Sequence, residues 1–131
     1  MILVDTSVWV DVLRDKTGEV VRAFKSRTET GVVVFSRFTQ LELLQGARDE
    51  HEWRRLDDYL STQYYLEASE NTWRHAARIY FELRRQGLTV RSPIDCCIAA
   101  IAMESQATLL HRDHDFDVIA GITPLDSEYF A

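Results

Sequence analysis

The stretch MILVDTSVWV, residues 1–10, begins like a buried strand and changes character at an acid. Its apolar run predicts a strand over residues 1–5 that ends at Asp5. Residues 6–14 then carry apolar side chains at helical spacing, which predicts a helix. Asp5 is therefore either the cap of that helix or a functional carboxylate at the end of a strand, and this stretch alone supports both interpretations.

The remainder of the chain continues this alternation of short strands and helices. Further strands are expected at residues 32–35, 64–66, 107–110 and 122–125, and further helices at residues 19–27, 38–47, 53–60, 70–86 and from Ser92 onward. Strands separated by helices predict an α/β fold with a parallel sheet covered on both faces. Glycine and proline are scarce and no linker is visible, so we expect a single domain over residues 1–131.

Two of these helices carry apolar side chains from which a buried face is predicted. In the helix at residues 38–47, Phe38, Leu41 and Leu44 are expected to form the buried stripe. In the helix at residues 70–86, the expected buried residues are Trp73, Ala77, Tyr80, Phe81 and Leu83.

Composition narrows the class of protein. A chain of 131 residues that is 46% hydrophobic can bury a substantial core. Its formal net charge of −6 is unlike that of most passive nucleic-acid binders, which are basic. Cys96 and Cys97 are neighbours in sequence and do not suit a disulfide, so two reduced thiols are expected. Without a membrane-length apolar segment or a signal peptide, a cytoplasmic protein is the expectation.

Five acids lie near the predicted strand ends and helix starts: Asp5, Glu42, Asp95, Asp113 and Asp115. Most have an ordinary structural explanation. Asp5 could cap a helix, Asp95 could complete a capping box with Ser92, and Asp115 could cap a short helix at residues 116–119. Glu42 is harder to explain, because on a helical wheel it lies about 40° from Phe38, beside the apolar stripe.

As a set, these acids would converge on the edge of a parallel sheet where ligands bind. Several carboxylates in contact cannot all stay ionised without a compensating cation. A set of oxygen ligands suits Mg²⁺ or Mn²⁺ better than zinc. His111 and His114 lie beside Asp113 and leave a nitrogen ligand open, although contact with solvent or substrate is the preferred interpretation.

Four short motifs give the sequence a resemblance to a known family. ILVDTS around Asp5, FTQLELLQGA around Glu42, SPIDCCIAAIA around Asp95 and LLHRDHDFDVIA around Asp113 together resemble the PIN domain, and more narrowly the VapC toxins of bacterial toxin–antitoxin pairs. The resemblance covers essentially the whole chain. It implies a three-layer α/β/α sandwich with a mainly parallel central sheet.

The resemblance also implies an activity and a site. The expected protein is an endoribonuclease dependent on Mg²⁺, for which Mn²⁺ substitutes. Metal-activated water would hydrolyse tRNA or rRNA and leave 5′-phosphate ends. The catalytic and metal-binding acids carried over are Asp5, Glu42, Asp95 and Asp113, with Asp115 as a secondary ligand. Ser7, next to Thr6, would orient Asp5 or a metal-bound water.

One position departs from the family pattern. Many relatives place Thr or Ser two residues before the fourth acid, where this chain has His111. The hydrogen bond usually made there is therefore in doubt, and a role for His111 in RNA contact or proton transfer is open.

The partners implied are RNA and protein. The cationic candidates for RNA contact are Arg84, Arg85, Arg91, His111 and Arg112. A VapB-type antitoxin would block the pocket with its carboxyl-terminal segment. A homodimer is expected, giving a heterotetramer or larger assembly with the antitoxin. Trp53, Tyr59, Tyr64 and Tyr65 are candidates for such a surface or for the core.

Two other functions compete. A strand ending in Asp also opens phosphatases of the haloacid-dehalogenase type, but these need a second Asp where this chain has Ser7. A non-catalytic RNA-binding domain of PIN-like fold is the other alternative, although such a domain is expected to lack one or more of the acids.

Overall fold

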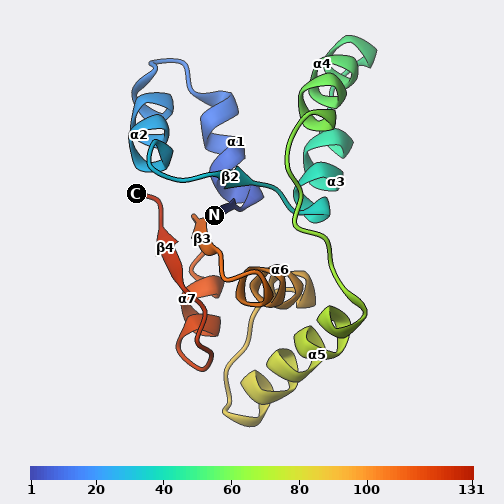
Figure 1. Ribbon diagram of the computed structural model, residues 1–131, viewed down its shortest axis with the longest axis vertical. Coiled ribbons are helices and arrows are strands. Elements are labelled where there is room, and N and C mark those ends of the chain that lie inside the picture. The colour runs from blue at the N-terminus through green and yellow to red at the C-terminus, as the bar shows by residue number, and fades with distance from the viewer.

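Four short parallel strands form the centre of the molecule, in the order β2-β1-β3-β4 (Figure 1). The computed structural model describes residues 1–131. The strands are β1 (Ile2–Val4), β2 (Val33–Val34), β3 (Thr108–His111) and β4 (Ser127–Tyr129). Because β1 pairs in parallel with β2 and β3, and β3 with β4, all carboxyl ends lie at one edge of the sheet.

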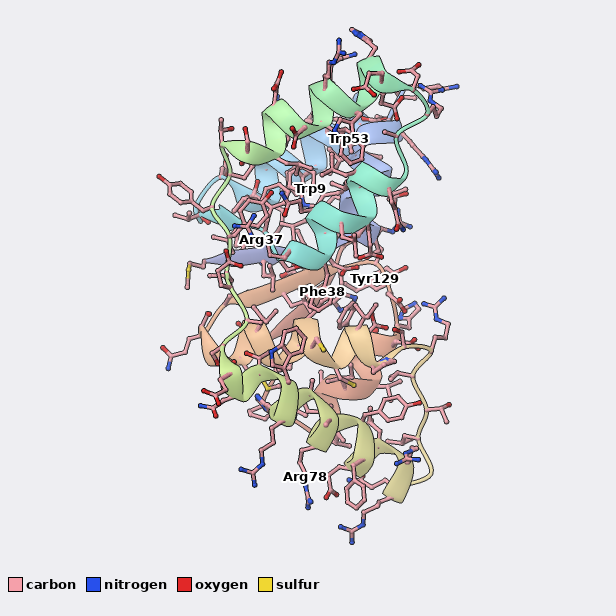
Figure 2. All side chains as sticks on the ribbon, turned by 90° about the vertical axis from the view of Figure 1, so that its right-hand side faces the viewer. Trp9, Arg37, Phe38, Trp53, Arg78 and Tyr129 are labelled. Carbon is pink, nitrogen blue, oxygen red and sulfur yellow. The ribbon has the colours of Figure 1, made fainter.

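Seven helices cover the sheet on both faces. They are α1 (Thr6–Arg14), α2 (Glu19–Thr28), α3 (Arg37–Gln45), α4 (Glu50–Ser61), α5 (Glu70–Arg85), α6 (Pro93–Glu104) and α7 (Asp115–Ala120). Figure 2 shows α1 to α4 on one side of the sheet and α5 to α7 on the other. The expected α/β/α sandwich with a parallel sheet is confirmed. None of the helices combines the length and apolarity needed to cross a membrane.

The strands divide the core into two clusters by simple alternation of their side chains. Leu3 and Leu109 pack with α5, α6 and α7 in the larger cluster. Their neighbours Ile2, Val4 and Leu110 point the other way and pack in the second cluster, beneath α1 to α4. Successive residues of a strand face opposite sides of a sheet, so these short apolar runs are buried on both faces.

Of the remaining predicted strands, the one at residues 122–125 is wrong and the one at residues 64–66 is reduced to a bridge. Residues 122–125 extend the turn after α7, where the Thr123 hydroxyl donates to the Ile119 carbonyl, and the edge strand β4 begins only at Ser127. Residues 64–66 make a single parallel bridge between Tyr65 and Phe35.

The predicted buried stripe of α3 is confirmed only in part, because Phe38 and Leu44 are partly buried and pack against the core. Thr39 and Leu43 are the buried residues of this helix, whereas Leu41 is 58% exposed. The helix packs against α1 and α4 with the side that carries Thr39 and Leu43. Glu42 is half-buried, at the border between this packed side and the pocket described below.

In α5 only Leu83 of the predicted face is buried. The side that packs on α6 carries the small or medium residues Thr72, Ala76 and Ile79. Small side chains allow the two helices to approach closely, and the bulkier Trp73, 56% exposed, is left on the outer surface.

Candidate active site

A pocket of about 290 Å³ lies at the carboxyl edge of the sheet. It is lined by Asp5, Thr6, Ser7, Val10, Glu42, Ser92, Ile94, Asp95, Ile98 and Asp113. The structure therefore brings together four of the acids singled out in the sequence, from the end of β1, from α3, from the first turn of α6 and from the segment after β3.

Asp5 is both a helix cap and a pocket residue. Its carboxylate Oδ2 accepts hydrogen bonds from the Ser7 backbone N–H at 3.0 Å and the Ser7 hydroxyl at 2.6 Å. Oδ1 takes part in neither bond. Only 7% of Asp5 is exposed, and this burial raises its pKa despite the bonds from Ser7. The cap interpretation of the opening stretch is therefore confirmed, and the same carboxylate also lies in the pocket at the end of β1.

Ser7 joins two sides of the pocket. Its hydroxyl donates to Asp5 and accepts the Arg112 backbone N–H at 2.9 Å. The segment that follows β1 is thus tied to the segment that follows β3. Arg112 itself pairs with Asp11 at 2.6 Å, beside this junction.

Glu42 is held in place by a threonine from the opening motif. Thr6 Oγ1 donates to Glu42 Oε1 at 3.0 Å and also lies 2.9 Å from the buried Thr39 hydroxyl. Burial raises the pKa of Glu42 and the nearby Asp5 charge adds to this effect, while the Thr6 bond opposes it.

Asp95 is the least compensated acid of the pocket. Ser92 caps α6 by accepting the Ile94 N–H at 3.1 Å, and Pro93 occupies the first helical position, as predicted. The carboxylate of Asp95 completes no capping box, and no protein group donates a hydrogen bond to it. Burial and then the charges of Asp113, Asp5 and Asp115 raise the pKa of Asp95 to about 7.

Three carboxylates come close enough to share one cation. Oxygen atoms of Asp95, Asp113 and Asp115 all lie within 4.8 Å of one another. Asp115 is the first residue of α7 rather than its cap, and its N–H donates to Asp113 Oδ1 at 3.0 Å.

Arg91 is the cation that contacts this group. Its guanidinium lies 2.5 Å from Asp113 Oδ2 and 3.1 Å from Asp115 Oδ2, and its backbone N–H also donates to Asp115 at 3.0 Å. Burial acts to raise the pKa of Asp115, but the bonds and charge of Arg91 outweigh it and lower that pKa. The sequence placed Arg91 near the acids but did not reveal that it pairs with two of them.

The prediction that His111 contacts RNA is wrong. The residue is 0% exposed, and its Nδ1 accepts the Asp113 backbone N–H at 3.2 Å, so this nitrogen is not free to bind a metal ion. Burial lowers the pKa of His111. His114 faces solvent, which agrees with the preferred interpretation of the sequence. Its ring stacks on that of Tyr129, with ring centroids 4.4 Å apart.

Arg84 and Arg85 do not line the pocket. They occupy the last turn of α5, where their guanidinium groups lie 5.5 Å from the Tyr80 ring centre and 5.6 Å from the Phe81 ring centre, respectively. Both residues therefore belong to the outer surface of α5. The sequence also gave no signal for Val10 and Ile98, which form the apolar part of the pocket wall.

Comparison with known proteins identifies the family. The PIN-domain model matches residues 2–122. The chain belongs to the PIN-domain family. Ribonuclease VapC11 of Mycobacterium tuberculosis is 40% identical to this PIN protein, over 99% of each chain. Ribonuclease VapC51 of the same species is 36% identical over 92% of this chain and 86% of its own.

Solved structures share the fold. VapBC2 from Rickettsia felis, bound to a DNA fragment from its promoter, superposes on this PIN protein with a TM-score of 0.80 over 100% of each chain at 20% identity. FitAcB from Neisseria gonorrhoeae superposes with a TM-score of 0.75 at 24% identity, over 100% of this chain and 97% of its own. Because the chain belongs to the PIN family, the alternative that it is a phosphatase of the haloacid-dehalogenase type is wrong.

Proposed function

We propose that this PIN protein is an endoribonuclease toxin that hydrolyses phosphodiester bonds of tRNA or rRNA with the help of Mg²⁺ or Mn²⁺. The observation that carries the proposal is the convergence of Asp5, Glu42, Asp95 and Asp113 from separate elements on one pocket. An ordinary helix cap does not require this convergence. Burial, and after it the charges of the neighbouring acids, raise the pKa of Asp95 to about 7. A non-catalytic domain would have no need of such a cluster.

The residues fit a divalent cation that prefers oxygen. Carboxylate oxygens of Asp95, Asp113 and Asp115 lie within 4.8 Å of one another, and the Asp95 oxygens accept no hydrogen bond. No cysteine or available histidine nitrogen lines the pocket, so the donor set suits Mg²⁺ or Mn²⁺. When bound, such an ion would lower the pKa of a coordinated water and stabilise charge on the phosphodiester.

The protein's own groups orient the free carboxylate oxygens. Ser7 bonds only Oδ2 of Asp5, and Thr6 bonds only Oε1 of Glu42, so each acid keeps its second oxygen available to the pocket. In this arrangement Asp5, Glu42 and Asp95 hold and orient the attacking water, and Asp113 completes the pocket. We also propose that Arg112, next to Ser7, and Arg91 contact RNA phosphates, because both lie beside the pocket.

We further propose that a VapB-type antitoxin inhibits the protein and that the toxin forms a homodimer, which makes a heterotetramer or larger assembly. An apolar groove of about 360 Å³ between α3 and α5, lined in part by Leu41 and Trp73, supports a protein partner. These side chains are 58% and 56% exposed. Of the aromatic candidates, Trp53, Tyr59 and Tyr64 are exposed, whereas Tyr65 is half-buried and donates to the Leu60 carbonyl.

The site of action would be the cytoplasm, where tRNA and rRNA are found. The free thiols of Cys96 and Cys97 agree with a reducing compartment.

The Arg91→Gln variant is expected to bind Mn²⁺ about fivefold more tightly than the wild type. Arg91 occupies oxygens of Asp113 and Asp115 that a cation would need. Exposed ion pairs are weak because water screens them, so the gain from freeing these oxygens is expected to be small, about fivefold. Titration of Mn²⁺, followed by the signal of the free ion in electron paramagnetic resonance, measures the change. Arg85→Gln, on the outer surface of α5, serves as the control, and weaker binding by Arg91→Gln would contradict the prediction.

The function is tested with toxin freed of antitoxin and incubated with total bacterial RNA and Mg²⁺ or Mn²⁺. Sequencing of 5′-phosphate ends maps the cuts. We expect a few discrete cuts that disappear with a chelator and in Asp5→Asn, and that persist in Asp57→Asn, which makes the same chemical change at an exposed position on α4. RNA binding without cleavage would instead support the non-catalytic alternative.

A further inference from the structure

His111 is a buried imidazole beside the pocket to which the proposed function gives no task. It packs against Phe116 and Tyr129, with ring centroids 5.1 and 5.7 Å away. Its Nδ1 accepts the backbone N–H of Asp113 at 3.2 Å, across the point where the chain leaves β3. The imidazole therefore contacts the backbone of a pocket acid rather than the pocket itself.

This hydrogen bond fixes the tautomer of the ring. A nitrogen that accepts a bond carries no proton, so the proton of the neutral imidazole lies on Nε2. Nε2 is buried without a hydrogen-bond partner and lies 3.6 Å from Asp117 Oδ1. The carboxylate of Asp117 is held on its other side by His114, at 2.7 Å. The Asp117 charge faces the Nε2 proton and favours this tautomer.

The segment between β3 and α7 determines where the Asp113 carboxylate points. The Oδ1 atom of Asp113 accepts the Asp115 N–H at 3.0 Å, and the Asp113 N–H donates to His111 Nδ1. With the backbone and one carboxylate oxygen fixed in this way, Oδ2 is directed toward Arg91 and the other acids.

We propose that His111 is a positioning residue: its Nδ1 fixes the backbone of Asp113 and so aims that carboxylate into the pocket, and Asp117 holds the imidazole in the required tautomer. The inference rests on the proposed function, since Asp113 is one of the proposed metal ligands. The short hydroxyl of a Thr or Ser can accept the amide two residues on in the same way. His111 does so while also filling the space between Phe116 and Tyr129.

The test compares His111→Leu, which keeps an apolar side chain but has no acceptor, with His111→Asn, whose Oδ1 can replace Nδ1. The ring proton of the wild type is located by long-range ¹H–¹⁵N correlation spectra. Hydrogen exchange of the Asp113 amide and the Mn²⁺ dissociation constant are measured for all variants. Circular dichroism checks that they are folded.

We expect the proton on Nε2 in the wild type. His111→Leu is expected to weaken Mn²⁺ binding about tenfold and to speed exchange of the Asp113 amide, while His111→Asn stays within about threefold of the wild type. If the leucine variant does not fold, Asp117→Asn, at a carboxylate that is 48% exposed, is used instead. It should raise the population of the Nδ1–H tautomer and weaken Mn²⁺ binding.

A proton on Nδ1 in the wild type would overturn the proposal, because that atom could not then accept the Asp113 amide. Equal Mn²⁺ affinity in the wild type and His111→Leu would also overturn it. If the wild type binds no Mn²⁺, the proposed metal site fails, but the tautomer and the Asp113 amide exchange still decide the role of His111.

Discussion

Asp95→Asn is expected to lower RNA cleavage by about a thousandfold or more. Asp95 contributes a carboxylate with no hydrogen-bond donor from the protein, within 4.8 Å of the oxygens of Asp113 and Asp115. The amide of asparagine has the same shape but carries no charge, so it cannot supply the anionic oxygen that a divalent cation prefers. The measurement is kcat/KM on the RNA found by mapping, in saturating Mg²⁺.

The same substitution is expected to stabilise the metal-free protein at pH 8. The pKa of Asp95 is raised to about 7 from an ordinary value of 3.8, so the folded state disfavours the ionised form. For an acid with a raised pKa, stability is lost as the pH rises from about 4 through 7 and stays low above it. The full shift corresponds to about 4 kcal/mol. Solvent reaches this half-buried carboxylate, and we therefore expect about 1 to 2 kcal/mol.

Urea unfolding in a chelator at pH 5.5 and pH 8 measures this effect. The wild type should be less stable at pH 8 than at pH 5.5, and Asp95→Asn should show a smaller difference. Asp57→Asn, at an exposed position, should follow the wild type in both stability and cleavage. An Asp95→Asn protein that is inactive and also less stable at both pH values would show that Asp95 has a structural role.

Mn²⁺ is expected to stabilise the wild type, and more strongly at pH 8 than at pH 6. A ligand present at about 100 times its dissociation constant adds about 2.7 kcal/mol to the free energy of unfolding. For a chain of this size, that corresponds to a rise in Tm of about 5 to 10 °C. At pH 6 the proton bound by Asp95 must be displaced, because the pKa of this carboxyl is about 7. The ion therefore binds more weakly at the lower pH.

Thermal melts with and without Mn²⁺ at the two pH values check this prediction. NaCl at equal ionic strength controls for general charge screening, and Asp95→Asn should show little stabilisation by Mn²⁺ at either pH. Equal stabilisation of the wild type and Asp95→Asn would place the ion outside this pocket.

The fold could be predicted wherever the chain carries an uninterrupted apolar run or a clear helix start. The helix predicted at residues 6–14 has the bounds of α1, and the runs around Leu3 and Leu109 are strands. The edge strand β4 could not be found, because Ser127–Tyr129 is short and polar. The buried sides of α3 and α5 were misjudged because both helices carry large apolar residues on exposed surfaces, and α5 packs through Ala76 and Thr72.

The candidate site was accessible from sequence to the extent that its acids follow strands or begin helices. Asp5 and Asp113 follow β1 and β3, and parallel strands bring such residues to one edge. The contacts that orient these acids could not be predicted from the sequence. Whether Arg91 pairs with Asp113, or His111 is buried, depends on how loops distant in sequence fold over the sheet end.

The bond between the Ser7 hydroxyl and the Arg112 amide joins residues that are 105 positions apart. Contacts so distant in the chain carry a large loop-closure entropy and tend to form late in folding. While a ribosome is still making the chain, Asp5 emerges early but cannot meet Asp113 until nearly all of the sequence has been synthesised. A nascent chain would therefore lack the assembled pocket, and the proposed activity would arise only once synthesis is nearly complete.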